Sequence, residues 1–312
     1  MFSQATIDAI QAYYLDHSER IYEEVYLNDE VPDGILRENV KDQRILRAGS
    51  STEMLQPYQD DFTPKGQAVM SGRKIVTDLV KIDVKDVPRK YHARNYFAHL
   101  KKSGNDPYDY PYAAFVLDKV MKRYYHDIAK AVRWAGVRAA VVAGTPGAAA
   151  DSSDGFLKQL DDSINVDASI VPITTGTFSN TDTVTKIETF VDAALSEVEL
   201  AEEEWVMWCH QSLANKYIRS YQAEHGTKLK VNEWGHLGVE GKNVRLVPQS
   251  GIGANQIIMA RPGNFQELSD GAPSMIIERH ERAYKIMVDG AIGFQYATTA
   301  EIFVNEQVDS TP

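Results

Sequence analysis

The sequence predicts an α+β fold with an extended amino-terminal region, a middle of alternating helices and strands, and a β-rich end. Three observations support this prediction. Residues 35–61 are polar and show little periodicity, residues 112–134 carry apolar side chains at three- and four-residue spacing, and residues 244–304 contain several short segments of strand composition. With 312 residues, the chain is long enough for about two domains.

Composition argues against several classes of protein. Hydrophobic residues make up 43% and charged residues 25%, as in ordinary globular chains. The 33 basic and 44 acidic residues give a net charge of −11, which disfavours wrapping nucleic acid through clustered Lys and Arg. Because Cys209 is the single cysteine, an intramolecular disulfide and a zinc site built mainly of cysteine are both excluded.

The sequence shows no secretory signal and no membrane span, so a reducing, aqueous compartment is expected. The first twenty residues lack the basic and apolar regions of a secretory signal. The most apolar stretch, residues 137–143, is far shorter than the roughly 20 residues that a membrane span requires.

The amino-terminal third predicts a helix, an arm and a hairpin. Residues 1–26 have the pattern of a helix, which the turn-forming residues 28–34 end, and residues 35–61 follow as an extended arm. Residues 65–86 alternate between apolar and polar side chains, and Ser71-Gly72 supplies a turn, so a long β-hairpin is expected. Its apolar face would carry Val76, Val80, Ile82 and Val84.

This predicted hairpin is basic in an acidic chain. Between Asp61 and Lys90 there are seven basic and four acidic residues, a local charge of +3. A hairpin of two strands is marginal in water because no third layer covers its apolar face. It must therefore either fold back on its own domain or lie on another molecule.

The middle of the chain predicts alternating helices and strands. A long helix is expected over 112–134, and a buried strand over 137–143 that Gly144 closes. Then follow a helix over 181–198 capped by Thr181, a strand over 204–209, and a helix over 211–224 that Gly226 ends.

The last third predicts a series of strands with a tight turn near the end. The expected strands are 244–247, 256–260, 274–278, 283–288 and 292–304. Asp289-Gly290 has the composition of a hairpin turn between the final two.

A search for catalytic motifs finds none. Gly144 follows an expected strand, but Pro146 and Ala149 occupy the second and third glycine positions of a dinucleotide fingerprint, and no P-loop or nucleophile elbow occurs. Cys209 and His210 are adjacent, so on a strand they point to opposite faces and would not share a proton. The run Glu202–Glu204 is expected to be a solvated face. The sequence thus predicts no enzyme, cofactor or metal ligand.

The order of the predicted elements, together with short motifs over nearly the whole chain, resembles that of one known protein family. The segments that carry this resemblance are Val84–Pro88, Arg133–Gly136, Asp154–Lys158, Trp205–Trp208, Asn264–Gly271 and Tyr284–Glu301. Together with the arm, basic hairpin and long helix, they resemble the major capsid proteins of tailed bacteriophages with the Hong Kong 97-type fold. The chain is most similar to those of phages that infect Bacteroidetes, including the crAss-like group.

The resemblance implies four structural parts. An amino-terminal arm would comprise residues 1–50 and an extended β-hairpin loop residues 51–90. A peripheral domain with a long helix (112–134) and a β-sheet would comprise residues 91–143 and 252–312. An axial α/β domain would comprise residues 144–251.

The implied function is structural. Such a protein self-assembles into hexamers and pentamers that form an icosahedral shell around double-stranded DNA, held by enclosure and not by sequence-specific binding. Scaffolding, portal and decoration proteins are the expected partners, with no membrane, and the expected location is the virion, assembled in the host cytoplasm. Candidate inter-subunit contacts are Phe62, Val69, Met70, Arg73, Lys74, Glu202 and Glu203. No lysine and asparagine can be matched to the covalent cross-link that some relatives form.

Two alternatives remain open at this point. A bacterial encapsulin-like nanocompartment shell protein shares the fold, and cargo-peptide binding would favour it. An α/β enzyme with an unrecognised site is the second, and turnover by the purified monomer would identify it.

Overall fold

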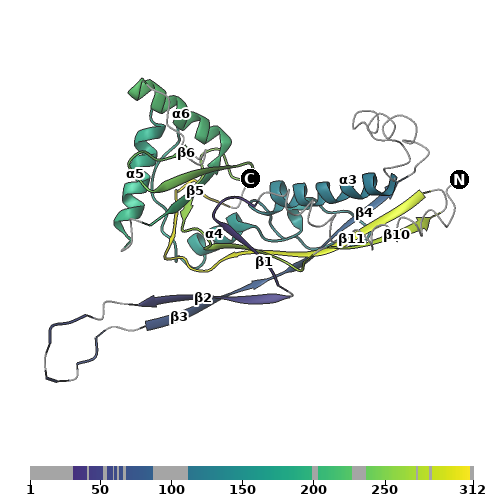
Figure 1. Cartoon of the computed structure of the whole chain (residues 1–312), viewed down its shortest axis with the longest axis horizontal. Coiled ribbons are helices and arrows are strands. Elements are labelled where there is room, and N and C mark those ends of the chain that lie inside the picture. The colour runs from purple at the N-terminus through teal and green to yellow at the C-terminus, as the bar shows by residue number, and fades with distance from the viewer. Residues whose placement is uncertain are drawn as a thin grey trace.

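Two sheets with adjoining cores and a projecting ribbon make up the part of the chain that the computed structural model describes (Figure 1). The described residues are 31–40, 42–51, 55–58, 60–61, 63–65, 68–86, 112–198, 203–226, 237–271, 273–280 and 283–309. The helix predicted over residues 1–26 lies outside them.

The first sheet is built around one long strand, β11. It is flanked by β10 and β4 along its first half and by β9 along its second, and β1 pairs with β9 in parallel. The strands are β1 (Ile35–Asn39), β4 (Asp78–Asp86), β9 (Phe265–Ser269), β10 (Ser274–His280) and β11 (Ala283–Tyr296). The helix α3 (Tyr112–Asp127) lies along this sheet and continues as a π-helical turn, Ile128–Val132 (Figure 1).

The second sheet has the order β12-β8-β5-β7-β6. Its strands are β5 (Trp205–His210), β6 (Leu237–Gly238), β7 (Val244–Gln249), β8 (Ile257–Ala260) and β12 (Ile302–Val304). The helices α5 (Thr183–Ser196) and α6 (Gln211–His225) pack on one face. Two of these strands, β8 and β12, come from residues 252–312, the segment expected to belong to the peripheral domain.

The second sheet is buried on both faces, so the two cores share it. Along β5, Trp205, Met207 and Cys209 join the core under α5 and α6, whereas Val206 and Trp208 join the core of the first sheet. This alternation follows from the two-residue period of a strand. The two layers are therefore joined through packed side chains.

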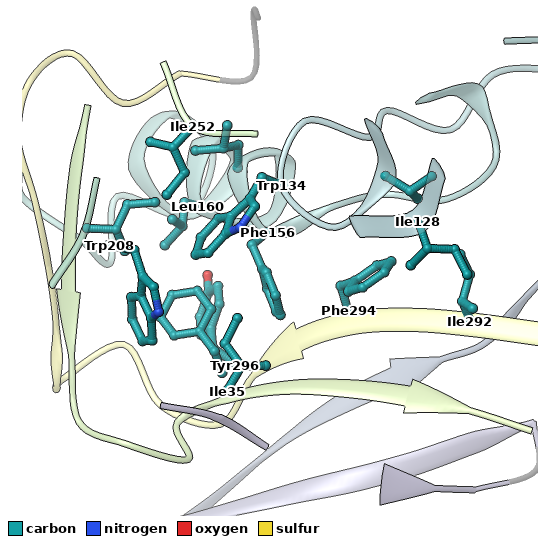
Figure 2. Packing of buried hydrophobic residues seen from close by; sticks show 14 of the residues in the cluster. Ile35, Ile128, Trp134, Phe156, Leu160, Trp208, Ile252, Ile292, Phe294 and Tyr296 are labelled. Atoms are coloured by element: carbon teal, nitrogen blue, oxygen red, sulfur yellow. The ribbon is translucent and has the colours of Figure 1, made fainter. Parts of the chain in front are cut away.

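Aromatic rings fill the junction (Figure 2). Trp134 at the end of the long helix lies 5.3 Å from Phe156 and 5.9 Å from Trp208, measured between ring centroids. Phe265 of β9 completes the group at 4.9 Å from Phe156 and 5.0 Å from Trp208. Phe156 begins α4 (Phe156–Asn165), so the motifs Arg133–Gly136, Asp154–Lys158 and Trp205–Trp208 meet in one core.

Several predicted elements are confirmed. The helix expected over 112–134 is α3 with its π-helical turn. The helix expected over 211–224 is α6, and Gly226 ends it with a left-handed φ of 65°. The helix expected over 181–198 is α5, but its N-cap is Asp182 rather than Thr181.

The predicted turn at Ser71-Gly72 is wrong. Residues 68–76 form one continuous strand, β3, which pairs with β2 (Gln43–Ser51) in an antiparallel ribbon. Gly72 instead leaves room for the side chain of Ile45 on the facing strand, from which a β-carbon at position 72 would lie 2.9 Å away. After Thr77 the chain continues into β4 of the first sheet.

The buried strand predicted over residues 137–143 is also wrong. This segment has no strand partner, and Val141 is 95% exposed. The backbone N–H groups of Val137 and Ala139 donate to the carbonyl oxygens of Ala150 and Asp151, so the segment forms the first limb of a surface loop.

The hairpin turn predicted at Asp289-Gly290 is the third error. Both residues lie inside the continuous strand β11. The glycine is required because the hydroxyl of Tyr124 on α3 lies against it, where a β-carbon would be 2.2 Å away.

Candidate assembly surfaces

The ribbon of β2 and β3 extends away from both sheets (Figure 1). In the loop at its far end, Leu55 is 86% and Tyr58 is 92% exposed. Described residues of its two limbs are linked, since Gln56 donates to the carbonyl oxygen of Thr63 at 2.7 Å and Lys65 donates to that of Leu55 at 2.8 Å. Exposed apolar side chains on a projecting element are typical of a protein contact surface.

The ribbon is attached to the body at its root. Leu46 and Ile75 are buried there together with Leu268 of β9. Thr77 donates to the carbonyl oxygen of Asp42 through both its N–H, at 2.9 Å, and its hydroxyl, at 3.0 Å. The root is thus a small apolar cluster, and next to it the hydrogen bonds between Thr77 and Asp42 extend the pairing of the two strands.

One polar contact lies further along the ribbon. The guanidinium of Arg73 lies 4.5 Å from the centre of the Tyr296 ring, and its Nη2 donates to the hydroxyl of Ser163 at 3.4 Å. Tyr296 ends β11, and Ser163 lies on α4. Arg73, predicted as an inter-subunit contact, thus contacts its own chain here.

The opposite face of the ribbon root is apolar and exposed. Ile45 is 63% and Val76 is 50% exposed, and Lys74, which pairs with Ile45, is exposed as well. The two exposed aliphatic side chains make this face of a projecting element a candidate contact surface.

The other predicted contact residues are spread over the chain. Val69 and Met70 lie on β3, whereas Phe62 and Glu202 lie outside the described residues. Glu203 forms an ion pair with Arg261 at 2.8 Å and keeps 51% of its side chain exposed. Arg261 also pairs with Glu301 at 3.1 Å. Arg73 and Glu203 contact different parts of their own chain. The roles of both residues in contacts between subunits stay predictions.

A buried ionic cluster that sequence reasoning missed joins three elements. Glu267 of β9 accepts from Arg37 of β1 at 2.7 Å and from Arg133, which follows the π-helical turn, at 2.8 Å. Burial acts to raise the pKa of Glu267, but the two guanidinium groups outweigh it and hold the pKa below its ordinary value. An alternating strand pattern cannot reveal such a carboxylate, because its partners lie 134 and 230 residues away.

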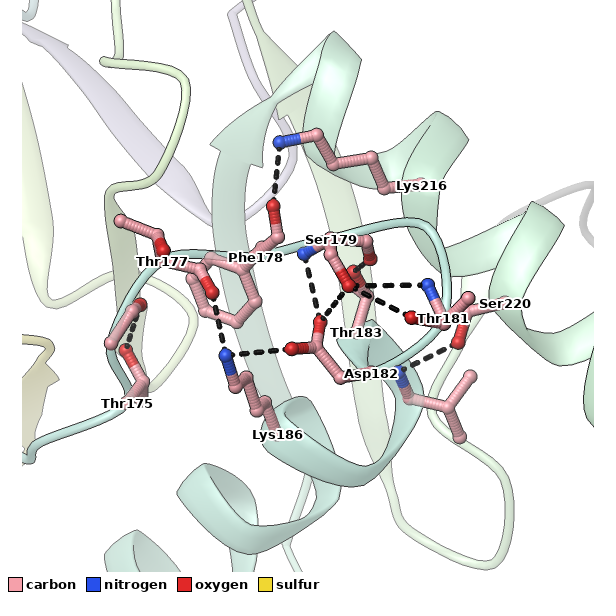
Figure 3. A network of polar contacts seen from close by, with 12 residues as sticks. Thr175, Thr177, Phe178, Ser179, Thr181, Asp182, Thr183, Lys186, Lys216 and Ser220 are labelled. Carbon is pink, nitrogen blue, oxygen red and sulfur yellow. Dashed lines mark hydrogen bonds and ion pairs between the residues drawn. The ribbon is translucent and has the colours of Figure 1, made fainter.

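A polar network fixes the loop before α5 (Figure 3). Asp182 accepts from the backbone N–H of Ser179 at 2.8 Å and pairs with Lys186 at 2.8 Å, and Lys186 also donates to the carbonyl oxygen of Thr177 at 2.6 Å. These hydrogen bonds lower the pKa of Asp182 to about 2. Because the donors and acceptors satisfy one another, the network is a structural one.

The adjacent Cys209 and His210 do not form a reactive pair. Cys209 is fully buried, and burial raises the pKa of its thiol to about 12. The Nδ1 atom of His210 accepts from the N–H of Ser212 at 3.1 Å and caps α6. Among the described residues, no group of three or more His, Cys, Asp and Glu side chains could hold a metal ion, and no helix is long and apolar enough to cross a membrane.

No protein-family model and no curated protein sequence matches the chain. Several solved structures match it. A chain from the procapsid of satellite phage P4, which includes the size determination (Sid) protein, matches with a TM-score of 0.55 at 13% identity over 95% of this chain and 99% of that one. A chain from the capsid of a native GTA particle matches with a TM-score of 0.53 at 10% identity over 87% of each chain.

The capsid of Myoviridae phage XM1 gives a third match, with a TM-score of 0.52 at 10% identity over 88% of this chain and 89% of that one. The fold of this chain is thus similar to that of capsid chains over most of its length. The chain has the α+β fold of Hong Kong 97-type capsid proteins, as its sequence predicted.

Proposed function

We propose that this chain is the major capsid protein of a tailed bacteriophage, which assembles with copies of itself into a closed shell. The observation that carries the proposal is the capsid fold over nearly the full length of both chains, combined with a ribbon whose far end projects beyond its own body (Figure 1). A two-stranded ribbon gains stability from a further layer, and a second copy of the chain supplies one.

The structural parts receive roles in this proposal. The β2–β3 ribbon is the extended loop, so this loop takes in β2, which lies almost wholly in the segment expected to be the arm (1–50). The first sheet with α3 is the peripheral domain, and the second sheet with α5 and α6 is the axial domain around the capsomer axis. Copies meet as hexamers and pentamers, and the net charge of −11 suits a wall that confines DNA without gripping it. The sequence resemblance supports a Bacteroidetes phage, including the crAss-like group, as the source and the virion as the location.

The predicted contact residues have a place in the same proposal. The outward face of the ribbon, with Lys74 beside the exposed Ile45 and Val76, docks on the body of a neighbouring copy. A stable protein interface buries about 1,600 Å² in total, and a ribbon of two nine-residue strands can supply a share of this to each neighbour. Catalysis has no part in this function.

The test is assembly of the full chain, expressed with and without a scaffolding protein and followed by sedimentation velocity. The unmodified chain should form particles far larger than a hexamer. Val76→Asp, on the outward face of the ribbon, should keep the fold but abolish these particles, whereas Val171→Asp, at a valine that is 81% exposed on the body, serves as the matched control. A monomer in every preparation, or particles of normal size from Val76→Asp, would overturn the proposal.

A further inference from the structure

Among the described residues of β3, two side-chain contacts join the ribbon to its body. The first is the apolar root, where Ile75 and Leu46 are buried with Leu268. The second is Arg73, two residues nearer the far end, whose guanidinium covers the ring of Tyr296. A single point of attachment permits pivoting, whereas two points on one strand define a direction.

The contact at Arg73 belongs to a chain of hydrogen bonds with a fixed polarity. The Tyr296 hydroxyl donates to the carbonyl oxygen of Gln159 at 3.1 Å, so it must accept from the hydroxyl of Ser163. The Ser163 oxygen in turn accepts from Arg73, since a guanidinium only donates. Ser163 and Tyr296 are both fully buried, so this acceptor site is held rigidly by α4 and β11.

We infer that Arg73 is a positioning residue that fixes the direction in which the ribbon leaves the body before a neighbouring copy is bound. A nine-residue strand is about 30 Å long, so a rotation of about 15° at the root would move its far end by about 8 Å. Holding the ribbon in one direction removes an ordering cost that docking would otherwise carry. The link to docking rests on the proposed function; the link to ribbon direction does not.

The chemistry of the contact requires arginine. A planar guanidinium stacks on an aromatic ring and donates a hydrogen bond in the same plane, which the ammonium group of lysine cannot do. Lys74 offers a matched control within the same strand. It carries the same charge, but it is exposed, and adjacent strand residues point to opposite faces.

The experiment measures the distance between spin labels on the ribbon loop and on the body. Labels are placed in the full chain at Leu55→Cys, which is 86% exposed, and at Val166→Cys, which follows α4 and is 75% exposed. The native Cys209 is fully buried and takes no label. The measurement uses the unassembled chain, separated from particles by size, and dilution with unlabelled protein leaves the distance within one chain as the measured quantity.

The unmodified chain and Lys74→Ala should give the same narrow distance distribution, and Arg73→Ala a broad one. The distribution of Arg73→Lys should be intermediate in width, and this variant provides the test if Arg73→Ala fails to fold. A distance distribution in Arg73→Ala that matches that of the unmodified chain would overturn the inference. If Arg73→Ala does not fold, a distribution in Arg73→Lys as narrow as that of the unmodified chain would overturn it.

Assembly supplies a separate measurement. Loss of one cation–π contact and one hydrogen bond should slow particle formation by about tenfold in light scattering of Arg73→Ala. If the unmodified chain forms no particles, the proposed function fails, while the label distances still decide the role of Arg73.

Discussion

The hydroxyl of Tyr124 on α3 lies against Gly290 in the middle of β11, where a β-carbon would be 2.2 Å from the hydroxyl oxygen. The long helix and the long strand therefore approach each other more closely than any residue with a side chain at position 290 permits. This contact sets the spacing between the helix and the sheet.

Gly290→Ala should lower the free energy of unfolding by about 1–3 kcal/mol, because the added methyl group forces the buried Tyr124 ring to move. Urea unfolding measures the change. The double variant Gly290→Ala/Tyr124→Phe should recover part of it, since Phe lacks the clashing oxygen. Equal stability of Gly290→Ala and the unmodified chain would contradict the contact.

The end of the long helix makes a second close approach, at Gly155. A β-carbon there would lie 2.4 Å from the carbonyl oxygen of Val132 and 2.6 Å from that of Trp134. Gly155→Ala should therefore cost about 3 kcal/mol of stability, because backbone atoms rather than a flexible side chain must shift. The matched control is Gly147→Ala, where the nearest atom is 3.5 Å away; comparable losses in the two variants would argue against this packing.

Glu267 should make the free energy of unfolding depend on pH in the acidic range. Its folded-state pKa lies below the ordinary value of 4.5, so its contribution is complete above that pH and is lost as the pH falls through the folded-state pKa. Glu267→Gln should cost about 3–5 kcal/mol at neutral pH, because two buried guanidinium groups lose their counter-charge. Its stability should also decline less steeply below pH 4.5.

Thermal unfolding at several pH values tests this, with Glu278→Gln as the control, since Glu278 is exposed on β10. A Glu267→Gln variant as stable as the control at pH 7 would show that the cluster has no such role.

Cys209 should be inert in the folded protein. With its pKa raised to about 12 by burial, only about one thiol in ten thousand is ionised at pH 8, and the sulfur is not exposed. Ellman's reagent should therefore react with one thiol per chain in guanidinium chloride and with none in native buffer. Rapid, complete reaction of the native protein would contradict the burial of β5.

The sequence predicted elements whose pattern is local. The apolar stripe of α3, the face of α5 and the Gly226 stop of α6 depend on neighbours three or four residues away, and each helix occurs as expected. Fold class was predicted from the order of such elements together with short motifs. Three of those motifs meet around Trp134, Phe156 and Trp208.

The errors share a different cause, which is contact between distant segments. The pairs Ser71-Gly72 and Asp289-Gly290 have the composition of turns. In the structure both glycines lie inside strands, where each is next to a side chain that is distant in sequence, Ile45 and Tyr124 respectively. The partners of Glu267 are equally remote in sequence. At the candidate surface, the sequence singled out Arg73 and Lys74 together, whereas the structure directs Arg73 to Tyr296 and leaves Lys74 exposed.

Cryo-electron microscopy of particles formed by the full chain tests the central claim most directly. The account predicts a closed, hollow shell in which the ribbon of each copy lies on a neighbouring copy. A protein that stays monomeric, or a particle whose ribbons touch only their own bodies, would contradict it.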